Sequence, residues 1–209
     1  MFHQQAISFK TQDNISLSGW FFVPENIPAP CIIMTHGFTA LKEHYLSKFA
    51  EVFASAGMCV LVYDNRNFGE SEGEPCFEVN PELQVRDLSD AISYVQTRSE
   101  VDANNIALWG TSFSGGNVIV AASMDSRVKC IVAQVPFVKG HHDFLKKTRP
   151  DLWEIIQKKY AADHKARSEG KPPAMTPVVT SDPTKSVVMK QREAYDFFTS
   201  VPAWQNQVT

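Results

Sequence analysis

Paired cysteines are missing from this sequence. It contains four cysteines, and none are spaced as in a C-x-x-C motif: Cys31, Cys59, Cys76 and Cys130. All but Cys76 lie inside short apolar runs, where a free thiol behaves as a small buried hydrophobic group. We therefore expect neither a disulfide framework nor a zinc site, and this cysteine usage is typical of a reducing compartment.

Long apolar runs are missing as well. No stretch approaches the roughly 18 apolar residues of a membrane span. The first residues show no cationic region followed by an apolar one, so no signal peptide is expected. The sequence therefore predicts a cytoplasmic protein that does not bind membranes.

A basic excess, which a nucleic-acid-binding protein usually carries, is also absent, since the net charge is -3. The charge is unevenly distributed, because residues 139–209 contain 12 Lys and Arg against 8 Asp and Glu. We favour a solvated helical face as the explanation, and attraction of an anionic substrate or carrier is the alternative.

The first 138 residues alternate between strand and helix patterns. Ile7, Phe9, Ile15 and Leu17 alternate with polar neighbours on the two sides of residues 13–14, which predicts an antiparallel hairpin. Strands are then predicted over 31–34, 58–63, 106–109 and 128–135, and helices over 46–53, 88–95 and 115–124. This order predicts an α/β fold with a mostly parallel sheet wrapped by helices.

After residue 138 this alternation stops. Residues 139–170 are charged and helical in character, and a second helix is predicted from about residue 183 to residue 199, with Asp182 as its cap. We therefore expect an incomplete core over residues 1–138 and a helical cap, or lid, over residues 139–209.

The segment 106–116 carries the main chemical signal. A nucleophile elbow needs a strand, a sharp turn with a serine at its tip, and a helix directly after it. With Ser112 at the tip, the residues two before and two after it are Gly110 and Ser114, which are small enough for the strained turn. Gly115 and Gly116 would let the following helix pack close to the sheet, and its N-terminal dipole would favour the developing oxyanion.

Ser114 is a rival nucleophile, because Ser112 and Gly116 would be its small neighbours. The strand pattern ends at Trp109, and an elbow serine usually follows within about three residues. This spacing favours Ser112. The alternative interpretation is a tight strand-to-helix turn without a catalytic role. The position of the motif after a third parallel strand argues against this alternative.

A second motif, over residues 34–39, directly follows the first buried strand. In this architecture that turn supplies a backbone N–H to an oxyanion hole, together with the N–H that follows the nucleophile. The donors here would be Phe38 and Phe113. Gly37 would allow the close approach of the backbone, and His36 is interpreted as a brace for the loop rather than as a catalytic group.

Together, residues 35–38, 63–73 and 108–116 resemble the dienelactone-hydrolase-like branch of the α/β hydrolases, which includes esterase-like proteins and fungal polyketide transferases. The resemblance implies serine acyl chemistry, a cap over the site and no cofactor. It also implies a structural role for the loop beside the site, whose matching residues are Asp64, Arg66, Gly69 and Ser71.

Members of that branch complete a triad with an acid after the seventh strand and a histidine after the eighth, and neither strand is expected in these 209 residues. The cluster formed by His141, His142 and Asp143 is the nearest substitute, but adjacent residues cannot easily form the required chain. We interpret it as part of the cap and expect no metal there. The apolar edge of a shortened sheet suggests a homo-oligomer or a complementing C-terminal segment.

Two functions follow. The first is a serine acyl hydrolase or acyltransferase that acts on a hydrophobic ester or thioester through an acyl-enzyme on Ser112. The second is a catalytically impaired pseudo-hydrolase that acts as a binding or scaffold protein. Six cap residues suggest an apolar acyl pocket: Leu145, Trp153, Ile156, Tyr160, Phe197 and Phe198.

Overall fold

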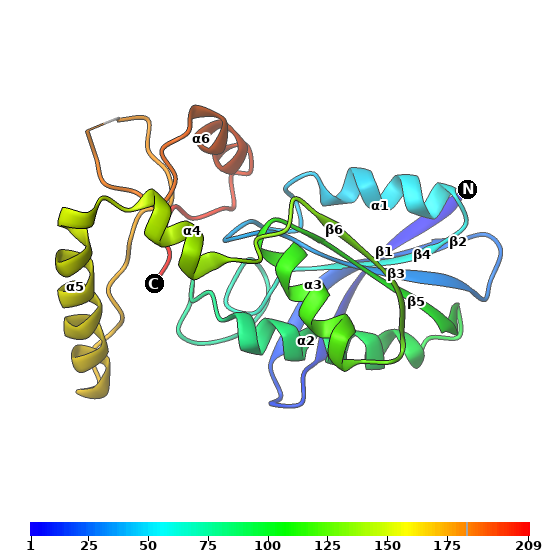
Figure 1. Cartoon of the computed structure of the whole chain (residues 1–209). Coiled ribbons are helices and arrows are strands. Elements are labelled where there is room, and N and C mark those ends of the chain that lie inside the picture. Colours follow the sequence, from blue (N-terminus) through cyan, green and yellow to red (C-terminus); the bar gives the residue numbers. More distant parts are fainter. Residues whose placement is uncertain (183) are drawn as a thin grey trace.

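The computed structural model describes residues 1–182 and 184–209, apart from the side chain of Lys147. It has one six-stranded sheet in the order β1-β2-β4-β3-β5-β6 (Figure 1). The strands are β1 (Phe2–Lys10), β2 (Ser16–Pro24), β3 (Ala29–Thr35), β4 (Cys59–Tyr63), β5 (Val101–Thr111) and β6 (Val128–Gln134). The helices are α1 (Leu46–Ser55), α2 (Pro81–Gln96), α3 (Phe113–Met124), α4 (Gly140–Lys147), α5 (Pro150–Ser168) and α6 (Arg192–Thr199).

The sheet is the predicted α/β arrangement. β1 and β2 form the antiparallel hairpin, β2 pairs antiparallel with β4, and β3 pairs parallel with both β4 and β5. One face is covered by α1 and the other by α2 and α3 (Figure 1). The apolar runs of β3 and β4 are buried because helices cover both of their faces.

The strand register brings the two predicted motifs together. Thr35, the last residue of β3, lies opposite Gly110 of β5, and Thr111 lies opposite Gln134 of β6. Because parallel strands end at the same edge of a sheet, the turns that follow β3 and β5 are neighbours there.

β6 is an edge strand that pairs only with β5 in the described chain, and five of its seven residues are exposed. Ile131 and Val132 are 37% and 42% exposed. The expectation that Cys130 is buried is therefore wrong, because its apolar run forms an uncovered edge. Cys31 and Cys59 are buried as expected.

The segment after α5 corrects a second prediction. Only Arg192–Thr199 is helical, not a stretch from about residue 183, which itself lies outside the described residues. The Asp182 carboxylate accepts hydrogen bonds from the N–H and the hydroxyl of Thr184, so it closes a turn instead of capping a helix. The N–H groups of Val188 and Met189 donate to carbonyls of residues 177 and 178, which ties this non-helical stretch to the preceding segment.

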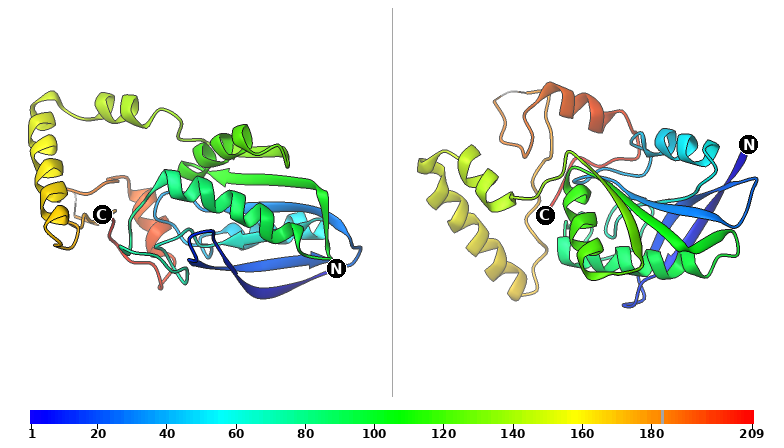
Figure 2. Two further views of the ribbon diagram at one scale, coloured as in Figure 1. Left: turned by 90° about the horizontal axis from the view of Figure 1, so that it is seen from below. Right: turned by 45° about the vertical axis from the view of Figure 1, so that its right-hand side comes forward.

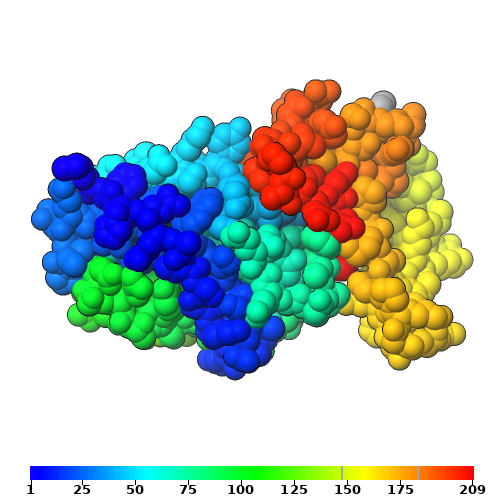
Figure 3. All heavy atoms as spheres, turned by 180° about the vertical axis from the view of Figure 1, so that it is seen from behind, coloured from blue at the N-terminus to red at the C-terminus, as the bar shows by residue number. Residues whose placement is uncertain are grey.

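Residues 139–209, the expected cap, have two different parts. α5, all of whose residues are described, buries no side chain and lies apart from the sheet (Figure 2). The last residues, drawn in red, instead lie against the loops of the core (Figure 3). They form an apolar cluster with those loops, whose buried members are Ala40, Val178, Val179, Phe198 and Val208. No helix in the described part of the chain is long and apolar enough to cross a membrane.

Candidate active site

Ser112 lies at the sharp turn between β5 and α3. Its backbone has φ 52° and ψ -112°, a conformation that residues other than glycine rarely adopt. The Ser112 N–H donates to the carbonyl of Gln134 at 2.9 Å, and its carbonyl accepts from the N–H of Phe137 at 2.8 Å. The chain leaving β6 therefore holds the strained residue from both sides.

The small residues around Ser112 are required by backbone contacts. A Cβ on Gly110 would lie 2.2 Å from the carbonyl oxygen of Ser114, and a Cβ on Gly116 would lie 2.4 Å from the carbonyl oxygen of Phe137. A Cβ on Gly115 would meet Cα of Pro136 at 3.0 Å. These distances explain why a strand, a turn and a helix can follow one another so tightly here.

Ser114, the rival serine, is 1% exposed and lies in the first turn of α3. Its hydroxyl donates to the carbonyl of His36. That hydrogen bond ties the elbow to the turn that follows β3, and it occupies the hydroxyl proton of Ser114.

The turn after β3 packs directly on the elbow. A Cβ on Gly37 would lie 3.3 Å from Cβ of Ser112, so this position keeps the two turns close. Within the described residues, no acceptor is hydrogen bonded to the backbone N–H of Phe38 or of Phe113. Two unpaired N–H groups on adjoining turns are the donors that an oxyanion hole requires.

His36 is buried, and its ring is engaged on both nitrogens. Nε2 accepts from the N–H of Asn65 at 2.9 Å, so Nδ1 carries the proton and donates to the carbonyl of Gly37 at 3.0 Å. Burial lowers the pKa of His36, which favours the neutral ring. The imidazole thus links the turn after β3 to the loop after β4.

The loop after β4 is held by two ionic networks, each centred on a buried cation. Lys42 Nζ donates to Asp64 at 2.7 Å and to Glu70 at 2.7 Å. Arg66 donates to Asp87 through Nε at 2.7 Å and also contacts Asp13 in the hairpin turn at 2.9 Å.

Two further loop residues, Gly69 and Ser71, approach Asp64 closely. Gly69 has φ 58° and no room for a Cβ, which would lie 2.3 Å from the Asp64 carboxylate. The Ser71 hydroxyl donates to the Asp64 carbonyl at 2.6 Å.

Carboxylate oxygens of Glu43, Asp64 and Glu70 lie within 4.8 Å of one another, which is the spacing of a metal site. The Lys42 ammonium already contacts all three, at 3.1 Å, 2.7 Å and 2.7 Å respectively. The cluster therefore neutralises a cation of the chain itself.

Residues 1–182 and 184–209 place no histidine or carboxylate in hydrogen-bond contact with the Ser112 hydroxyl. His141 and His142 are exposed in the first turn of α4. Among the described residues, the only carboxylate within ion-pair distance of His142 is its neighbour Asp143, at 3.3 Å. Among the described residues, neither histidine is therefore connected to the Ser112 turn by a hydrogen bond.

The expected apolar pocket in the cap does not form as one unit. Phe198 is buried against Trp204, with ring centroids 4.8 Å apart, while Tyr160 on α5 is 75% exposed. The rings of Phe144 and Trp153 pack together, with centroids 5.8 Å apart. The pair of Phe198 and Trp204 and the pair of Phe144 and Trp153 therefore lie in separate parts of residues 139–209, because α5 does not pack on the core.

Aromatic rings flank the elbow instead. The Phe113 ring lies 6.1 Å from the ring of Phe38 and 6.2 Å from that of Phe137. Sequence reasoning did not select Phe137; its position directly after Pro136 at the end of a strand was the available signal. These rings form an apolar group around Phe113, the residue that directly follows Ser112.

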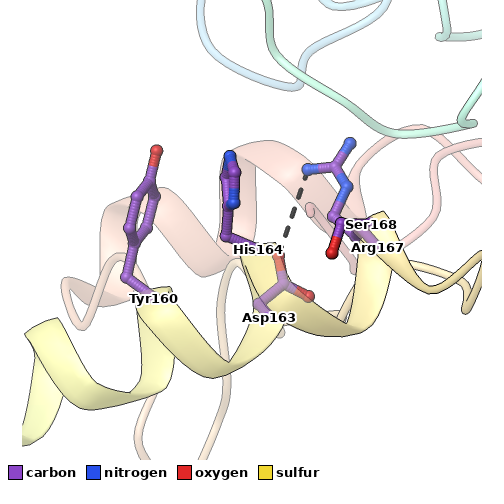
Figure 4. A pocket seen from close by; sticks show the side chains of 5 residues that line it. All are labelled: Tyr160, Asp163, His164, Arg167 and Ser168. Atoms are coloured by element: carbon purple, nitrogen blue, oxygen red, sulfur yellow. Dashed lines mark ion pairs between the residues drawn. The ribbon is translucent and has the colours of Figure 1, made fainter.

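An open hollow of about 350 Å³ runs along one side of α5, lined by Tyr160, Asp163, His164, Arg167 and Ser168 (Figure 4). Arg167 forms an ion pair with Glu78 of the core, and the Asp163 carboxylate accepts the N–H of Ala174 at 2.7 Å. The polar groups of this hollow are thus partly used to attach α5 to its neighbours.

A mostly parallel sheet with a serine at a strained strand-to-helix turn defines the protein as an α/β hydrolase. Residues 13–199 match the X-Pro dipeptidyl-peptidase (S15 family) model, so the chain belongs to this family.

Two relatives and one solved structure support this assignment. A thiohydrolase of Eupenicillium brefeldianum is 32% identical over 99% of this chain and 67% of the relative. A polyketide transferase of Aspergillus fumigatus is 33% identical over 86% of this chain and 59% of the relative. The crystal structure of the α/β hydrolase GrgF from Penicillium sp. superimposes with a TM-score of 0.83 at 27% identity, covering 99% of this chain and 70% of that one.

Proposed function

We propose that the protein is a serine acyl hydrolase or acyltransferase that acts on a hydrophobic acyl ester or thioester. The observation that carries this proposal is the strained Ser112 turn, which packs on the turn at Gly37. Among the described residues, the backbone N–H groups of Phe38 and Phe113 on these two turns have no hydrogen-bond acceptor. The named activities of the relatives, a thiohydrolase and a polyketide transferase, are consistent with acyl chemistry on such a serine.

In the proposed reaction, Ser112 Oγ attacks the carbonyl carbon while its proton passes to a base. The Phe38 and Phe113 N–H groups stabilise the oxyanion of the tetrahedral intermediate. Collapse of this intermediate expels the alcohol or thiol and leaves an ester on Ser112. Water then gives hydrolysis, or a second alcohol gives transfer, with residues 139–209 as the lid that controls access.

The surroundings of Ser112 favour a hydrophobic acyl group. The Phe38, Phe113 and Phe137 rings provide apolar surface beside the serine. We expect an acyl chain or aromatic acyl group to contact these rings.

We further propose that the base and its acid come from polypeptide that meets the exposed edge at β6, either a complementing segment or a second copy. The exposed apolar residues of β6 and the partial coverage of the relatives support this proposal. Sedimentation of the purified protein as a stable monomer with no associated polypeptide would argue against it.

The activity is tested by covalent labelling with a fluorophosphonate probe. We expect labelling of the folded protein that disappears in Ser112→Ala. Ser123→Ala on the same helix is the matched control, since Ser123 is exposed and its hydroxyl only bonds to the carbonyl of Val120. Unchanged labelling of Ser112→Ala, or no labelling of the folded wild type in the assembly that supplies the base, would refute the proposal.

The alternative function is that of a non-catalytic binding or scaffold protein. It is favoured by the observation that the described residues bring no histidine to the Ser112 hydroxyl. A folded protein that binds acyl esters without turnover or labelling would support this alternative.

A further inference from the structure

The turn that carries the Phe38 N–H holds an unfavourable residue. The Ala40 N–H donates to the Gly37 carbonyl at 3.2 Å, so residues 37–40 form a four-residue turn with Phe38 and Thr39 at its centre. Thr39 has φ 52°, whereas turns that need a positive φ at this position normally use glycine or asparagine. A β-branched residue is strained there, and such strain persists only when the surroundings impose it.

The Thr39 side chain does not relieve this strain. Its hydroxyl is buried and has no hydrogen-bond partner among the described residues. Something other than the local sequence must therefore hold the turn.

Trp204, far along the chain, supplies the contact. Its indole Nε1–H donates to the carbonyl of Thr39 at 2.7 Å, and no other described donor reaches that carbonyl. The indole is fixed in turn by stacking on Phe198, with ring centroids 4.8 Å apart.

The segment that contains Phe198 and Trp204 contacts the loop between β3 and α1 at a second point. The His44 ring accepts from the N–H of Leu41 at 3.0 Å and donates to the carbonyl of Phe198 at 3.2 Å. Ala40 is buried in the apolar cluster that contains Phe198. The loop between β3 and α1 is therefore packed against the segment that contains Trp204.

We propose that Trp204 is a positioning residue for the oxyanion hole: by bonding to Thr39 it holds the 37–40 turn and thereby orients the Phe38 N–H. This inference rests on the proposed function of Phe38. The physical link is the turn itself, because the direction of the peptide plane that carries the Phe38 N–H depends on the turn dihedral angles.

The test uses Trp204→Phe, which keeps an aromatic ring on Phe198 but removes the N–H donor. Trp153→Phe is the matched control, because Trp153 lies on α5, which buries no side chain, and the pocket expected there does not form in the structure. Trp153 packs on Phe144, and its indole has no described hydrogen bond. We expect faster amide hydrogen exchange across residues 37–45 in Trp204→Phe, with α2 unaffected and no change in Trp153→Phe.

The catalytic consequence is measured by separating fluorophosphonate binding from the labelling step. We expect the first-order labelling rate to fall about tenfold in Trp204→Phe, with the half-saturating probe concentration nearly unchanged, because a misplaced oxyanion donor weakens the transition state more than the ground state.

Thr39→Gly provides a rescue. Glycine tolerates a positive φ without strain, so the turn should keep its shape without the indole bond. We therefore expect the double variant Thr39→Gly/Trp204→Phe to label much closer to the wild-type rate than Trp204→Phe alone.

Each result decides a separate point. Unchanged amide hydrogen exchange across residues 37–45 in Trp204→Phe would overturn the proposal that the indole holds the turn. An equal loss of labelling in Trp153→Phe would show that the effect is not specific to Trp204. A wild-type protein that does not label refutes the proposed function and with it the catalytic role of Trp204, while hydrogen exchange still decides whether the indole holds the turn.

Discussion

Replacing Arg66 with methionine should strongly destabilise the fold, because it leaves a carboxylate buried without a counterion. The Asp87 side chain is fully buried and receives two hydrogen bonds from Arg66, at 2.7 Å and 2.5 Å. Asp13, the other partner of Arg66, is 43% exposed and can be rehydrated. Most of the cost therefore comes from Asp87.

Breaking one side of a buried ion pair typically costs about 3–5 kcal/mol. We expect the free energy of unfolding of Arg66→Met to fall by about that amount at pH 7, as measured by urea unfolding followed by circular dichroism. The exposed pair of Arg192 and Asp196 gives the control, and Arg192→Met should leave the free energy of unfolding nearly unchanged.

The pH dependence gives an independent check on the mechanism. Burial already raises the pKa of Asp87 in the wild type, and without Arg66 that pKa should rise further, so the folded variant binds more protons than its unfolded state. Stability then increases as the pH falls, and the deficit of Arg66→Met relative to wild type should narrow between pH 7 and pH 5.

A double variant completes the test. Arg66→Met/Asp87→Asn should recover most of the lost stability, because the buried charge is gone. A loss below about 1 kcal/mol in Arg66→Met, or a double variant less stable than the single one, would contradict the reasoning from an uncompensated charge.

Three further predictions concern the elbow, the loop before α1 and the sheet edge. Gly110→Ala should abolish fluorophosphonate labelling, because its Cβ would lie 2.2 Å from a backbone oxygen. Gly57→Ala is the control: its Cβ would meet no atom within 4 Å, so labelling should be kept. The φ of 91° at Gly57 should lower the free energy of unfolding of that variant by about 1 kcal/mol. Burial lowers the pKa of His44 from 6.5, so the unfolded state binds a proton more readily than the folded state as the pH falls. The free energy of unfolding should therefore decrease at pH values below about 6.5, by at most about 1.4 kcal/mol per pH unit. Urea unfolding of His44→Gln should show a flatter pH profile than that of the wild type. Val132→Lys on the β6 edge should abolish association with further polypeptide in sedimentation experiments while leaving the fold intact, and an unchanged assembly would contradict pairing at that edge.

Much of the core could be predicted because its signals are local. The continuous apolar runs of β3 and β4 and the periodic pattern of α1 correspond to elements of the structure. The fold class follows from their alternation along the chain. The boundaries were less well determined, since β5 runs from Val101 to Thr111 and is longer than its apolar run.

The cap was harder to predict because tertiary contacts override its local preferences. The helical pattern before Arg192 gives way to irregular backbone, since residues 188 and 189 are hydrogen bonded to the segment at 177–178. The apolar residues of α5 remain exposed or half-buried because the helix does not lie on the core. Sequence periodicity shows that such a helix has an apolar side but not whether anything covers it.

The sequence by itself determined the elbow: a strand pattern, then glycine, serine and small residues at spacings that only a tight strand-to-helix turn requires. Only the tertiary structure decided what holds that elbow and its neighbouring turn in place. Ser112 is held by the chain that leaves β6, and the Thr39 carbonyl is held by Trp204. Contacts between positions so far apart depend on how the elements pack, and no local pattern around Ser112 or Thr39 records them.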